Sequence, residues 1–353
     1  MKKSNTALSR QLSDIISELF PLRAVNWRAA SDTSPDLFLR AETGAYVVID
    51  TKSAASSMVV RDAILRVKSH ASAVVAALGK VPVVPVIGVP SMGETGQRLC
   101  AEAGVGWIDL AGNANIRGPG IVISISGRKP TKRKPGTGDN PFAQKSSRVI
   151  KRLLSEPQRW ISQHDLAKES RLDEGYVSKI VRRLEHDSQL QRDPARRLRP
   201  RSPDALIDEW RDHYDFGKHH RIAGHVPARS GPELIEMVGE RLRRSSVAHA
   251  FTGLAGAWLL TKFANFRLGT VLVEALPSED LLQAIGFRTD PRGANLWMVA
   301  PTDSDPIISA QTVDGFSCAD PIQVYLDLKG HPERAQEAAN EVRRRLIEWH
   351  DND

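Results

Sequence analysis

The chain has 353 residues, 41% of them hydrophobic, and its 49 basic and 42 acidic side chains give a formal net charge of +7. This length allows two or three domains, each with its own core. Two cysteines, Cys100 and Cys318, are too few for a disulfide scaffold or a zinc ribbon. The N-terminus lacks the apolar run of a signal peptide, and the longest apolar stretch, 81–90, is too short to span a bilayer. We therefore expect a cytoplasmic, nucleoid-associated protein with no membrane partner.

The first 127 residues alternate between helical and strand patterns. In chain order they predict helix 8–20, strands 37–40 and 45–50, helix 58–78, strand 83–89, helix 94–103, and strands 107–110 and 121–126. Strands that alternate with helices are typical of α/β architecture. We therefore expect an α/β domain with a mixed sheet over residues 1–127.

Two of these predicted strands carry charged residues in an order typical of nucleases. Asp36 precedes the first strand, and Asp50 and Lys52 lie at the end of the second. Two carboxylates from adjacent strands can converge on Mg²⁺, and alternation places Lys52 on the same face as Asp50, where it can orient water or stabilise phosphate charge. This order resembles the PD-(D/E)XK site of restriction-endonuclease-like domains. The resemblance implies that Asp36, Asp50 and Lys52 are catalytic and that the two aspartates bind Mg²⁺.

Two further acids are candidates for the same site. Glu18 lies on the preceding helix, where this superfamily often adds an acid, and Asp109 ends a later strand. Asp109 precedes a Gly112-Asn113 turn, so a turn-capping role is the preferred interpretation for it.

Each main residue of this motif also has a structural interpretation. Asp36 can serve as a turn residue after Pro35, and Asp50 with Lys52 can form a surface ion pair. A second Asp-x-Lys begins at Asp327, without a preceding Pro-Asp strand, and we expect it to be structural. Short motifs of this kind arise by chance, so fold and activity are separate hypotheses.

Residues 128–144 are rich in Pro, Gly and Lys and are predicted to be a linker. They open a basic segment, 128–201, that holds 20 Lys and Arg against 9 Asp and Glu. The rest of the chain is mildly acidic. Such an uneven distribution is typical of a module that binds a polyanion.

Within this segment, residues 145–216 predict a winged helix-turn-helix. The first helix is expected at 147–154, a second begins after the cap Ser162, and a third begins after the cap Asp173. The third helix has apolar residues at helical spacing, which predict a buried stripe formed by Val177, Ile180, Val181 and Leu184.

The opposite face of the third helix is polar and basic and is expected to enter the major groove of double-stranded DNA. A strand, tip and strand over 190–203 would form a basic wing that contacts phosphate. The predicted DNA-binding residues are Tyr176, Ser178, Lys179, Arg182, Arg183, Arg196 and Arg197.

The motif has one departure and one alternative. The tight turn before the third helix often holds Gly but here holds Arg171, for which a left-handed conformation costs about 1 kcal/mol. The alternative is an ordinary helical hairpin with a solvated basic face. The stretch from Ser147 to Phe216 resembles the winged-helix modules of bacterial transcription regulators.

Residues 217–353 predict a second α/β domain. Helices are expected at 232–244, 253–263, 278–285, 321–328 and 332–349, and strands at 270–274 and 296–299. The spacing of His219, His220 and His225 suits no zinc site, so we expect these residues to face solvent. In the last helix Val342, Leu346 and Trp349 are expected to face inward, although a partner groove is an alternative.

Two segments of this region, AFTGLAGAWLL and DPIQVYLDLKGHPERAQEAANEVRRRL, resemble the C-terminal domain of AbiEi-type antitoxins of type IV toxin-antitoxin systems. The resemblance implies a repressor of its own operon that opposes a nucleotidyltransferase toxin. This chain departs from that pattern by the 140 or so residues that precede the winged helix. The strand 270–274 holds only Glu274, so transferase activity receives little weight.

Two functions therefore remain. The favoured one is a DNA-binding transcriptional regulator of the AbiEi antitoxin type, in a toxin-antitoxin or phage-defence operon, which needs no cofactor. The alternative is a Mg²⁺-dependent endonuclease that its winged helix delivers to DNA. A homodimer on a palindromic site would suit the first.

Overall fold

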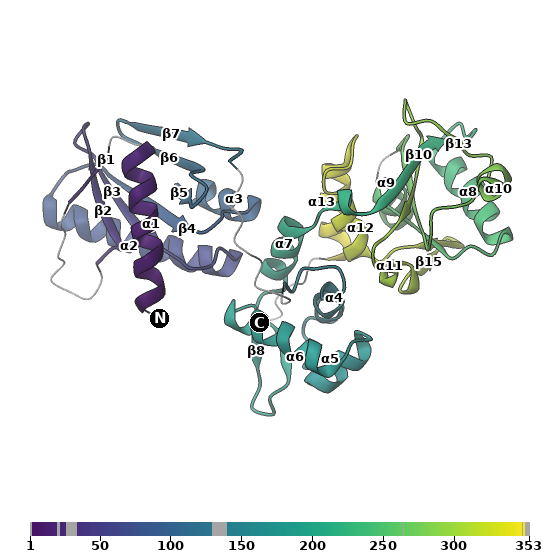
Figure 1. The fold of residues 1–353 in the computed structure, drawn as a ribbon, viewed down its shortest axis with the longest axis horizontal. Coiled ribbons are helices and arrows are strands. Elements are labelled where there is room, and N and C mark those ends of the chain that lie inside the picture. Colours follow the sequence, from purple (N-terminus) through teal and green to yellow (C-terminus); the bar gives the residue numbers. More distant parts are fainter. Residues whose placement is uncertain are drawn as a thin grey trace. The chain divides into compact units, whose positions relative to one another are not determined.

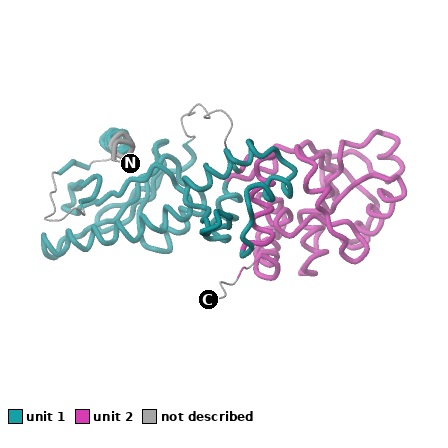
Figure 2. The backbone as a smooth tube through the Cα atoms, turned by 90° about the horizontal axis from the view of Figure 1, so that it is seen from below, with its two compact units in different colours: residues 1–141, 158–212 teal, residues 142–157, 213–353 magenta. Residues whose placement is uncertain are grey.

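The structure is a computed structural model that describes residues 2–19, 22–25, 34–128, 140–263, 265–347 and 349. The chain divides into two compact units, which Figure 2 distinguishes by colour. The first unit comprises residues 1–141 and 158–212, and the second comprises residues 142–157 and 213–353. The predicted 145–216 module is thus divided between the two units, and most of the predicted linker, 129–139, lies outside the described residues.

A seven-stranded mixed sheet forms the centre of the first unit, with its strands in sequential order from β1 to β7. The strands β3, β4 and β5 run parallel, and their neighbours on both sides are antiparallel. The bounds are β1 Leu22–Ala24, β2 Leu37–Ala41, β3 Tyr46–Thr51, β4 Val83–Val89, β5 Gly106–Asp109, β6 Ala114–Gly118 and β7 Ile121–Ile125. The α/β architecture predicted for this region is confirmed.

Helices cover this sheet and produce two apolar layers. Helix α1 (Lys2–Leu19), which crosses the sheet in Figure 1, contributes Leu8, Leu12 and Ile16 to a core with Val47 and Ile49. Helices α2 (Ser57–Leu78) and α3 (Glu94–Ala103) bury their apolar residues against Val48, Ile87 and Trp107. Successive residues of β3 therefore point to alternate layers, as a strand buried on both faces requires.

Residues 158–212 continue the first unit as two short helices, a two-stranded ribbon and a third helix. These elements are α5 (Gln163–Glu169), α6 (Glu174–His186), β8 (Leu190–Arg192), β9 (Leu198–Pro200) and α7 (Pro203–His213). The strands β8 and β9 pair antiparallel, as predicted for the wing. The helix expected at 147–154 is α4 (Ser147–Ser155), which belongs to the second unit.

The second unit contains another seven-stranded sheet, in the order β13-β10-β14-β12-β11-β16-β15. Its central pair, β12 and β14, is parallel. The strands are β10 His220–His225, β11 His249–Thr252, β12 Gly269–Val273, β13 Arg288–Thr289, β14 Leu296–Ala300, β15 Gln311–Val313 and β16 Phe316–Cys318. The helices are η1 Phe216–Lys218, α8 Gly231–Arg244, α9 Gly253–Thr261, α10 Glu279–Ala284, α11 Asp305–Ile308, α12 Pro321–Asp327 and α13 Ala335–Leu346.

The structure corrects two expectations for this region. Residues 220–225 form the strand β10 between β13 and β14, so the histidines are not a solvent-facing stretch: His219 and His225 are half-buried, and only His220 is exposed. The strand pattern was hard to detect because burial does not alternate along β10: His220 and Arg221 are both exposed, and Ile222 and Ala223 are both half-buried. In α13, Val342 is buried, but Leu346 is 44% exposed and does not face inward. None of the described helices is long and apolar enough to cross a membrane.

Candidate functional site

Helix α6 has the two-faced character that the sequence predicts. The side chain of Asp173 accepts a hydrogen bond from the backbone N–H of Tyr176 at 3.1 Å and caps the helix. The predicted stripe is completely buried, since Val177, Ile180, Val181 and Leu184 are at most 1% exposed. This packing orients the other face of α6 outward.

The helix before it is held by a matching set of local contacts. Ser162 accepts from the backbone N–H of Asp165 at 3.0 Å, which confirms the predicted cap of α5. Arg171 has a φ of 55°, so the turn does adopt the left-handed conformation despite its lack of Gly. His164 and Glu174 lie 2.5 Å apart and join the beginnings of α5 and α6. Residues 162–186 therefore form two capped helices, α5 and α6, joined by a short turn with a left-handed residue.

The outward face of α6, here called the α6 basic face, consists of Tyr176, Ser178, Lys179, Arg182 and Arg183. Its three cations are exposed, and the two neutral residues are half-buried. Arg183 forms an ion pair with Asp187 at 2.7 Å, whereas Arg182 contacts only the Ser178 carbonyl of its own helix among the described residues. Lys179 has no hydrogen bond or ion pair with any part of the chain that the structure describes. Lys179 and Arg182 are thus the cations most available to an external phosphate.

The ribbon of β8 and β9 carries the predicted basic wing. A backbone bridge from Ile161 to Leu198 attaches the ribbon to the residues before α5. Arg196 lies at the tip with a φ of 63°, and its side chain is exposed. A tip that projects an arginine beside a helix of this kind suits contact with a polyanion backbone.

Most other arginines of the wing already have partners in the same unit. Arg197 pairs with Asp193 at 2.7 Å, and Arg192 pairs with Glu185 at 2.5 Å. Arg199 lies over the Trp160 ring, 4.4 Å from its centroid. Arg196 and Arg201 are therefore the exposed arginines of the wing that have no acidic partner among the described residues.

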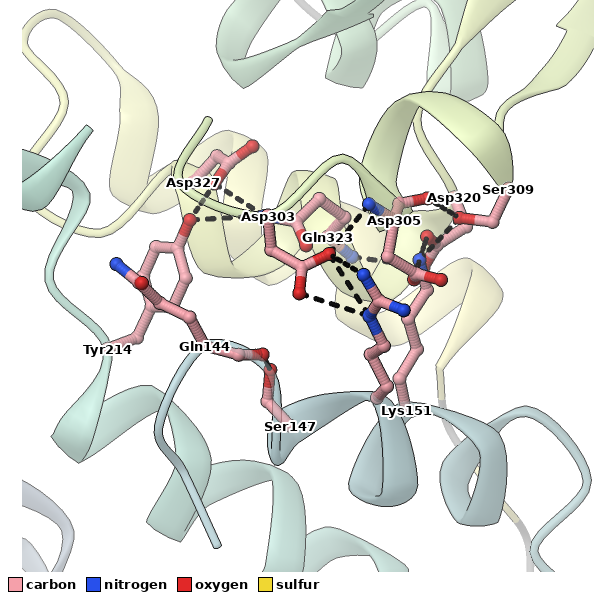
Figure 3. Close-up of polar contacts among 11 residues, drawn as sticks. Gln144, Ser147, Lys151, Tyr214, Asp303, Asp305, Ser309, Asp320, Gln323 and Asp327 are labelled. Carbon is pink, nitrogen blue, oxygen red and sulfur yellow. Dashed lines mark hydrogen bonds and ion pairs between the residues drawn. The ribbon is translucent and has the colours of Figure 1, made fainter. Parts of the chain in front are cut away.

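Part of the basic charge counted in the sequence is neutralised in the second unit. Figure 3 shows Lys151 of α4 directed toward Asp305, the first residue of α11, and Asp320, the N-cap residue of α12. Arg148 binds Asp303 in a bidentate manner, with a closest distance of 2.7 Å. Lys151 lies 2.9 Å from Asp305 and 2.7 Å from Asp320.

These α4 cations are buried as well as paired. Lys151 is only 13% exposed, and it also donates to the Ser309 hydroxyl at 2.6 Å. Burial acts to lower its pKa, but the charges of Asp320 and Asp305 outweigh burial and raise the pKa. The positive charge of Arg148 and Lys151 is therefore structural and does not contribute to a DNA-binding surface.

The candidate nuclease residues do lie together, where β2 begins and the antiparallel strand β3 ends. The Asp36 backbone N–H donates to the Ile49 carbonyl at 3.0 Å, so Asp36 is the cross-strand neighbour of Asp50. Asp36 is exposed, but one of its carboxylate oxygens accepts from both the N–H and the hydroxyl of Thr51, each at 2.7 Å. Asp36 thus ties the ends of the two strands together.

Asp50 and Lys52 form an ion pair, as the structural interpretation of the motif has it, but Asp50 is buried and the pair is not at the surface. Asp50 is 1% exposed, and its Oδ2 lies 2.9 Å from Nζ of Lys52. Arg66 from α2 lies 3.6 Å from Oδ1. Burial raises the pKa of Asp50, while Lys52 and Arg66 act in the opposite direction.

Sequence reasoning missed two residues of this cluster, Arg66 and His70. They lie one turn apart on α2, and His70 is buried with no hydrogen-bond partner for its Nδ1 among the described residues. Burial lowers the pKa of His70, and the charge of Asp50 opposes this effect. The i, i+4 spacing was visible in the sequence, but nothing there linked α2 to the end of β3.

The two additional acids do not join the cluster. Glu18 is exposed on α1. Asp109 accepts hydrogen bonds from the backbone N–H groups of Ala111 at 2.9 Å and Asn113 at 3.0 Å, which is the turn-capping role preferred for it. No group of three or more His, Cys, Asp or Glu residues within the described ranges is arranged to hold a metal ion.

The fit of this cluster to Mg²⁺ is poor in the present arrangement. Mg²⁺ prefers oxygen ligands in octahedral geometry, and proteins usually hold it with one or two carboxylates together with water and substrate phosphate. The Asp50 carboxylate is contacted by two cations, and the Asp36 carboxylate is bound by Thr51. The side chains therefore form a charge-paired cluster around the buried Asp50 carboxylate that does not match a metal centre.

The second Asp-x-Lys motif has the structural role expected of it. Asp327 at the end of α12 accepts hydrogen bonds from the Tyr214 hydroxyl, from Gln323 at 2.8 Å and from the Thr252 hydroxyl at 2.5 Å. Figure 3 shows Tyr214 and Gln323 converging on this carboxylate. Burial raises the pKa of Asp327 to about 6, and these hydrogen bonds oppose the rise.

Comparisons with known proteins add little to this geometry. No protein-family model matches the chain, and no curated protein matches it. A solved structure described as "Structure of EndoMS-dsDNA2 complex" matches with 19% sequence identity and a TM-score of 0.22. The match covers 27% of this chain and 41% of that chain. A TM-score of this size carries no argument about fold or function.

Proposed function

We propose that this chain is a DNA-binding transcriptional regulator that reads double-stranded DNA through α6. The observation that carries the proposal is the α6 basic face: a buried apolar stripe orients Lys179 and Arg182 outward, and neither is neutralised by an acid of the described chain. Arg suits guanine and phosphate, and Ser178 can bond to either base type. The wing tip at Arg196 supplies a second contact to the backbone.

The test is direct binding to DNA at several salt concentrations. Full-length protein is titrated into fluorescent duplexes, both random-sequence and drawn from the region upstream of its own gene. A regulator should show salt-sensitive binding, because each phosphate contact releases counterions, and a preference for a particular site. Absence of binding at low salt would reject the proposal.

The alternative, a Mg²⁺-dependent endonuclease, is supported by the adjacency of Asp36, Asp50 and Lys52. It is disfavoured by the neutralised state of that cluster, which would have to release Lys52 and Thr51 before its carboxylates could bind a metal. Incubation with supercoiled and linear DNA with and without Mg²⁺ separates the two functions. Metal-dependent cutting that Asp50→Asn abolishes would make the chain an endonuclease.

The finer assignment, an AbiEi-type antitoxin with a nucleotidyltransferase toxin as partner, is supported only by the sequence resemblance of the C-terminal segments. It predicts that the chain represses its own promoter and relieves growth arrest by a co-expressed neighbouring nucleotidyltransferase. A homodimer on a palindromic site belongs to the same proposal, and sedimentation of the protein with and without its duplex would test it.

A further inference from the structure

Helix α7, which follows the ribbon of β8 and β9, directs acidic side chains to the first turns of α2 and α3. Glu209 accepts a hydrogen bond from the backbone N–H of Ser57, the first residue of α2, at 3.1 Å. Asp212 accepts from the backbone N–H of Thr95 at 3.1 Å and from its hydroxyl at 3.3 Å. The two acids are three residues apart and so lie on one face of α7.

These contacts satisfy backbone N–H groups at the start of α3, and at the start of α2 they add to the cap that Ser56 already provides. The first N–H groups of a helix have no partner inside it and carry a partial positive charge. Gly93, the N-cap residue of α3, has no side chain to accept from them, and Asp212 takes that role. A Cβ on Gly93 would lie 2.5 Å from the Asp212 carboxylate, so the glycine is what permits the approach.

Further contacts fasten α7 at the same place. The Ser57 hydroxyl donates to the Ala205 carbonyl at 3.1 Å, and Arg98 of α3 lies 3.6 Å from Asp208. Because α2 and α3 follow the parallel strands β3 and β4, their N-termini lie at the edge of the sheet where Asp50 and Lys52 are found. We call this set of contacts, made by Ala205, Asp208, Glu209 and Asp212, the α7 latch.

The α7 latch also lies within electrostatic range of α6, the proposed DNA-binding helix. Arg183 and Asp187, at the end of α6, act electrostatically on Glu209. Helix α7 begins three residues after β9, and the backbone N–H of Arg201 between them donates to the Gln189 carbonyl at 2.9 Å. The element that closes the wing is therefore the one that caps α2 and α3.

We infer that the α7 latch couples the α6 basic face to the N-terminal α/β region. DNA bound at α6 then stabilises the first turns of α2 and α3. This inference rests on the proposed DNA binding for its input. Its mechanism rests on the hydrogen bonds of Glu209 and Asp212. By reciprocity, loosening of the latch changes the dynamics of α6 even without DNA.

Protonation near neutral pH adjusts the latch. Burial raises the pKa of Glu209 to about 7, the charges of Asp212 and Asp187 act in the same direction, and the hydrogen bond from Ser57 and the charge of Arg183 oppose them. The remaining charged pair at the docking surface is Arg98 with Asp208. Glu209 thus stays protonated to a higher pH when α7 contacts α2 than when that contact is broken. The contact therefore becomes weaker as pH rises through about 7.

The experiment is hydrogen exchange on the full chain, with and without a bound duplex, at pH 6 and pH 8. In the wild type, DNA should slow exchange at the first turns of α2 and α3 by about fivefold or more, the lower end of typical coupling between sites. The effect should be smaller at pH 8. The double variant Glu209→Ala, Asp212→Ala removes both hydrogen-bond acceptors and should restrict DNA-dependent protection to α5, α6 and the ribbon.

Two further variants, one that perturbs the latch and one control, accompany the double variant. Gly93→Ala retains every carboxylate but displaces Asp212 by steric contact, and it should reproduce part of the loss if the double variant fails to fold. Asp62→Asn removes an exposed carboxylate of α2 that lies outside the latch, and it should retain most of the protection.

The inference would be overturned if DNA still slowed hydrogen exchange at the first turns of α2 and α3 to the wild-type extent in both the double variant and Gly93→Ala. If the protein binds no duplex, the proposed function is wrong. The latch is then tested without DNA: hydrogen exchange in α6, α2 and α3 must be faster in the double variant than in the wild type.

Discussion

Individual side chains of the basic segment fall into two groups that the sequence does not separate. Arg148 and Lys151 form ion pairs with aspartates of their own unit. Ion-pair partners are also present for Arg183, Arg192 and Arg197. Lys179, Arg182 and Arg196 remain exposed without a neighbouring acid among the described residues. A charge count over 128–201 therefore overstates the charge that DNA would meet.

This distinction predicts unequal effects on DNA binding. Arg182→Ala and Lys179→Ala should each weaken binding and lower the dependence of log K on log salt by about one unit for each phosphate that is no longer neutralised. Arg183→Ala should have a smaller effect, because Asp187 already compensates its charge. Fluorescence anisotropy over a salt series measures both quantities.

Arg244→Ala is the control for that series, since Arg244 is an exposed residue of α8 that pairs with Glu240. Equal weakening of binding by Arg244→Ala and Arg182→Ala would mean that α6 does not read DNA.

The buried pair of Asp50 and Lys52 gives a stability prediction. Lys52→Met leaves the Asp50 carboxylate buried with only Arg66 at 3.6 Å, so the free energy of unfolding should fall by about 2–3 kcal/mol at pH 8. The loss should be smaller at pH 5. Burial raises the pKa of Asp50, and without Lys52 the rise is larger, so stability present at low pH is lost as pH increases.

Urea denaturation at the two pH values measures this difference. Lys68→Met, an exposed lysine of α2, is the matched control and should change stability by less than about 0.5 kcal/mol. Identical behaviour of the two variants would show that the Asp50 carboxylate is not buried.

At the scale of elements, α7 and α4 both make long-range polar contacts, and both are amphipathic helices that local patterns describe only in part. Helix α7 caps two helices through Glu209 and Asp212, whereas α4 contacts α11 and α12 through Arg148 and Lys151. Each helix thus serves a different unit, although the sequence suggests a single module that contains both.

The latch predicts a pH-dependent stability of the first unit. The pKa of Glu209 is raised to about 7 from 4.5, so its contribution is complete below pH 4.5 and is lost as pH rises through 7. Partial solvent screening reduces the effect to on the order of 2 kcal/mol. The difference in unfolding free energy between wild type and Glu209→Gln should therefore change by about this amount between pH 5 and pH 8. A constant difference across that range would contradict the assignment.

Helix α4 gives the corresponding prediction for the second unit. Lys151→Met leaves Asp305 and Asp320 facing each other without their shared cation, and the unfolding free energy should fall by about 3 kcal/mol. Chemical denaturation followed by intrinsic fluorescence gives the value. Lys218→Met, at an exposed site of the same unit, should have little effect. A loss no larger than that of the control would mean that the ion pairs contribute nothing.

At the scale of the whole molecule, two units with separate sheets and separate cores make up the chain. We expect calorimetry to resolve two unfolding transitions, because each unit buries its own apolar surface. Lys52→Met should lower the temperature of one transition and Lys151→Met that of the other. A single transition that both variants shift equally would contradict this division.

Local patterns in the chain were enough to predict most helices and strands of the first unit, the caps Ser162 and Asp173, and the buried stripe of α6. Each of these depends on residues within a few positions of one another, where helical or strand periodicity and capping chemistry operate. The adjacency of Asp36 and Asp50 was also predictable, since two neighbouring strands joined by a short turn must pair.

Only the tertiary structure decided which basic side chains form ion pairs and to which compact unit each helix belongs. Lys151 meets Asp305 and Asp320, and Ser57 meets Glu209, across more than 150 positions of the chain. The burial of Asp50 and the approach of His70 likewise depend on α2 packing over β3. Periodicity carries no information about such distant pairs, because they form only when separate elements bury their apolar faces against each other.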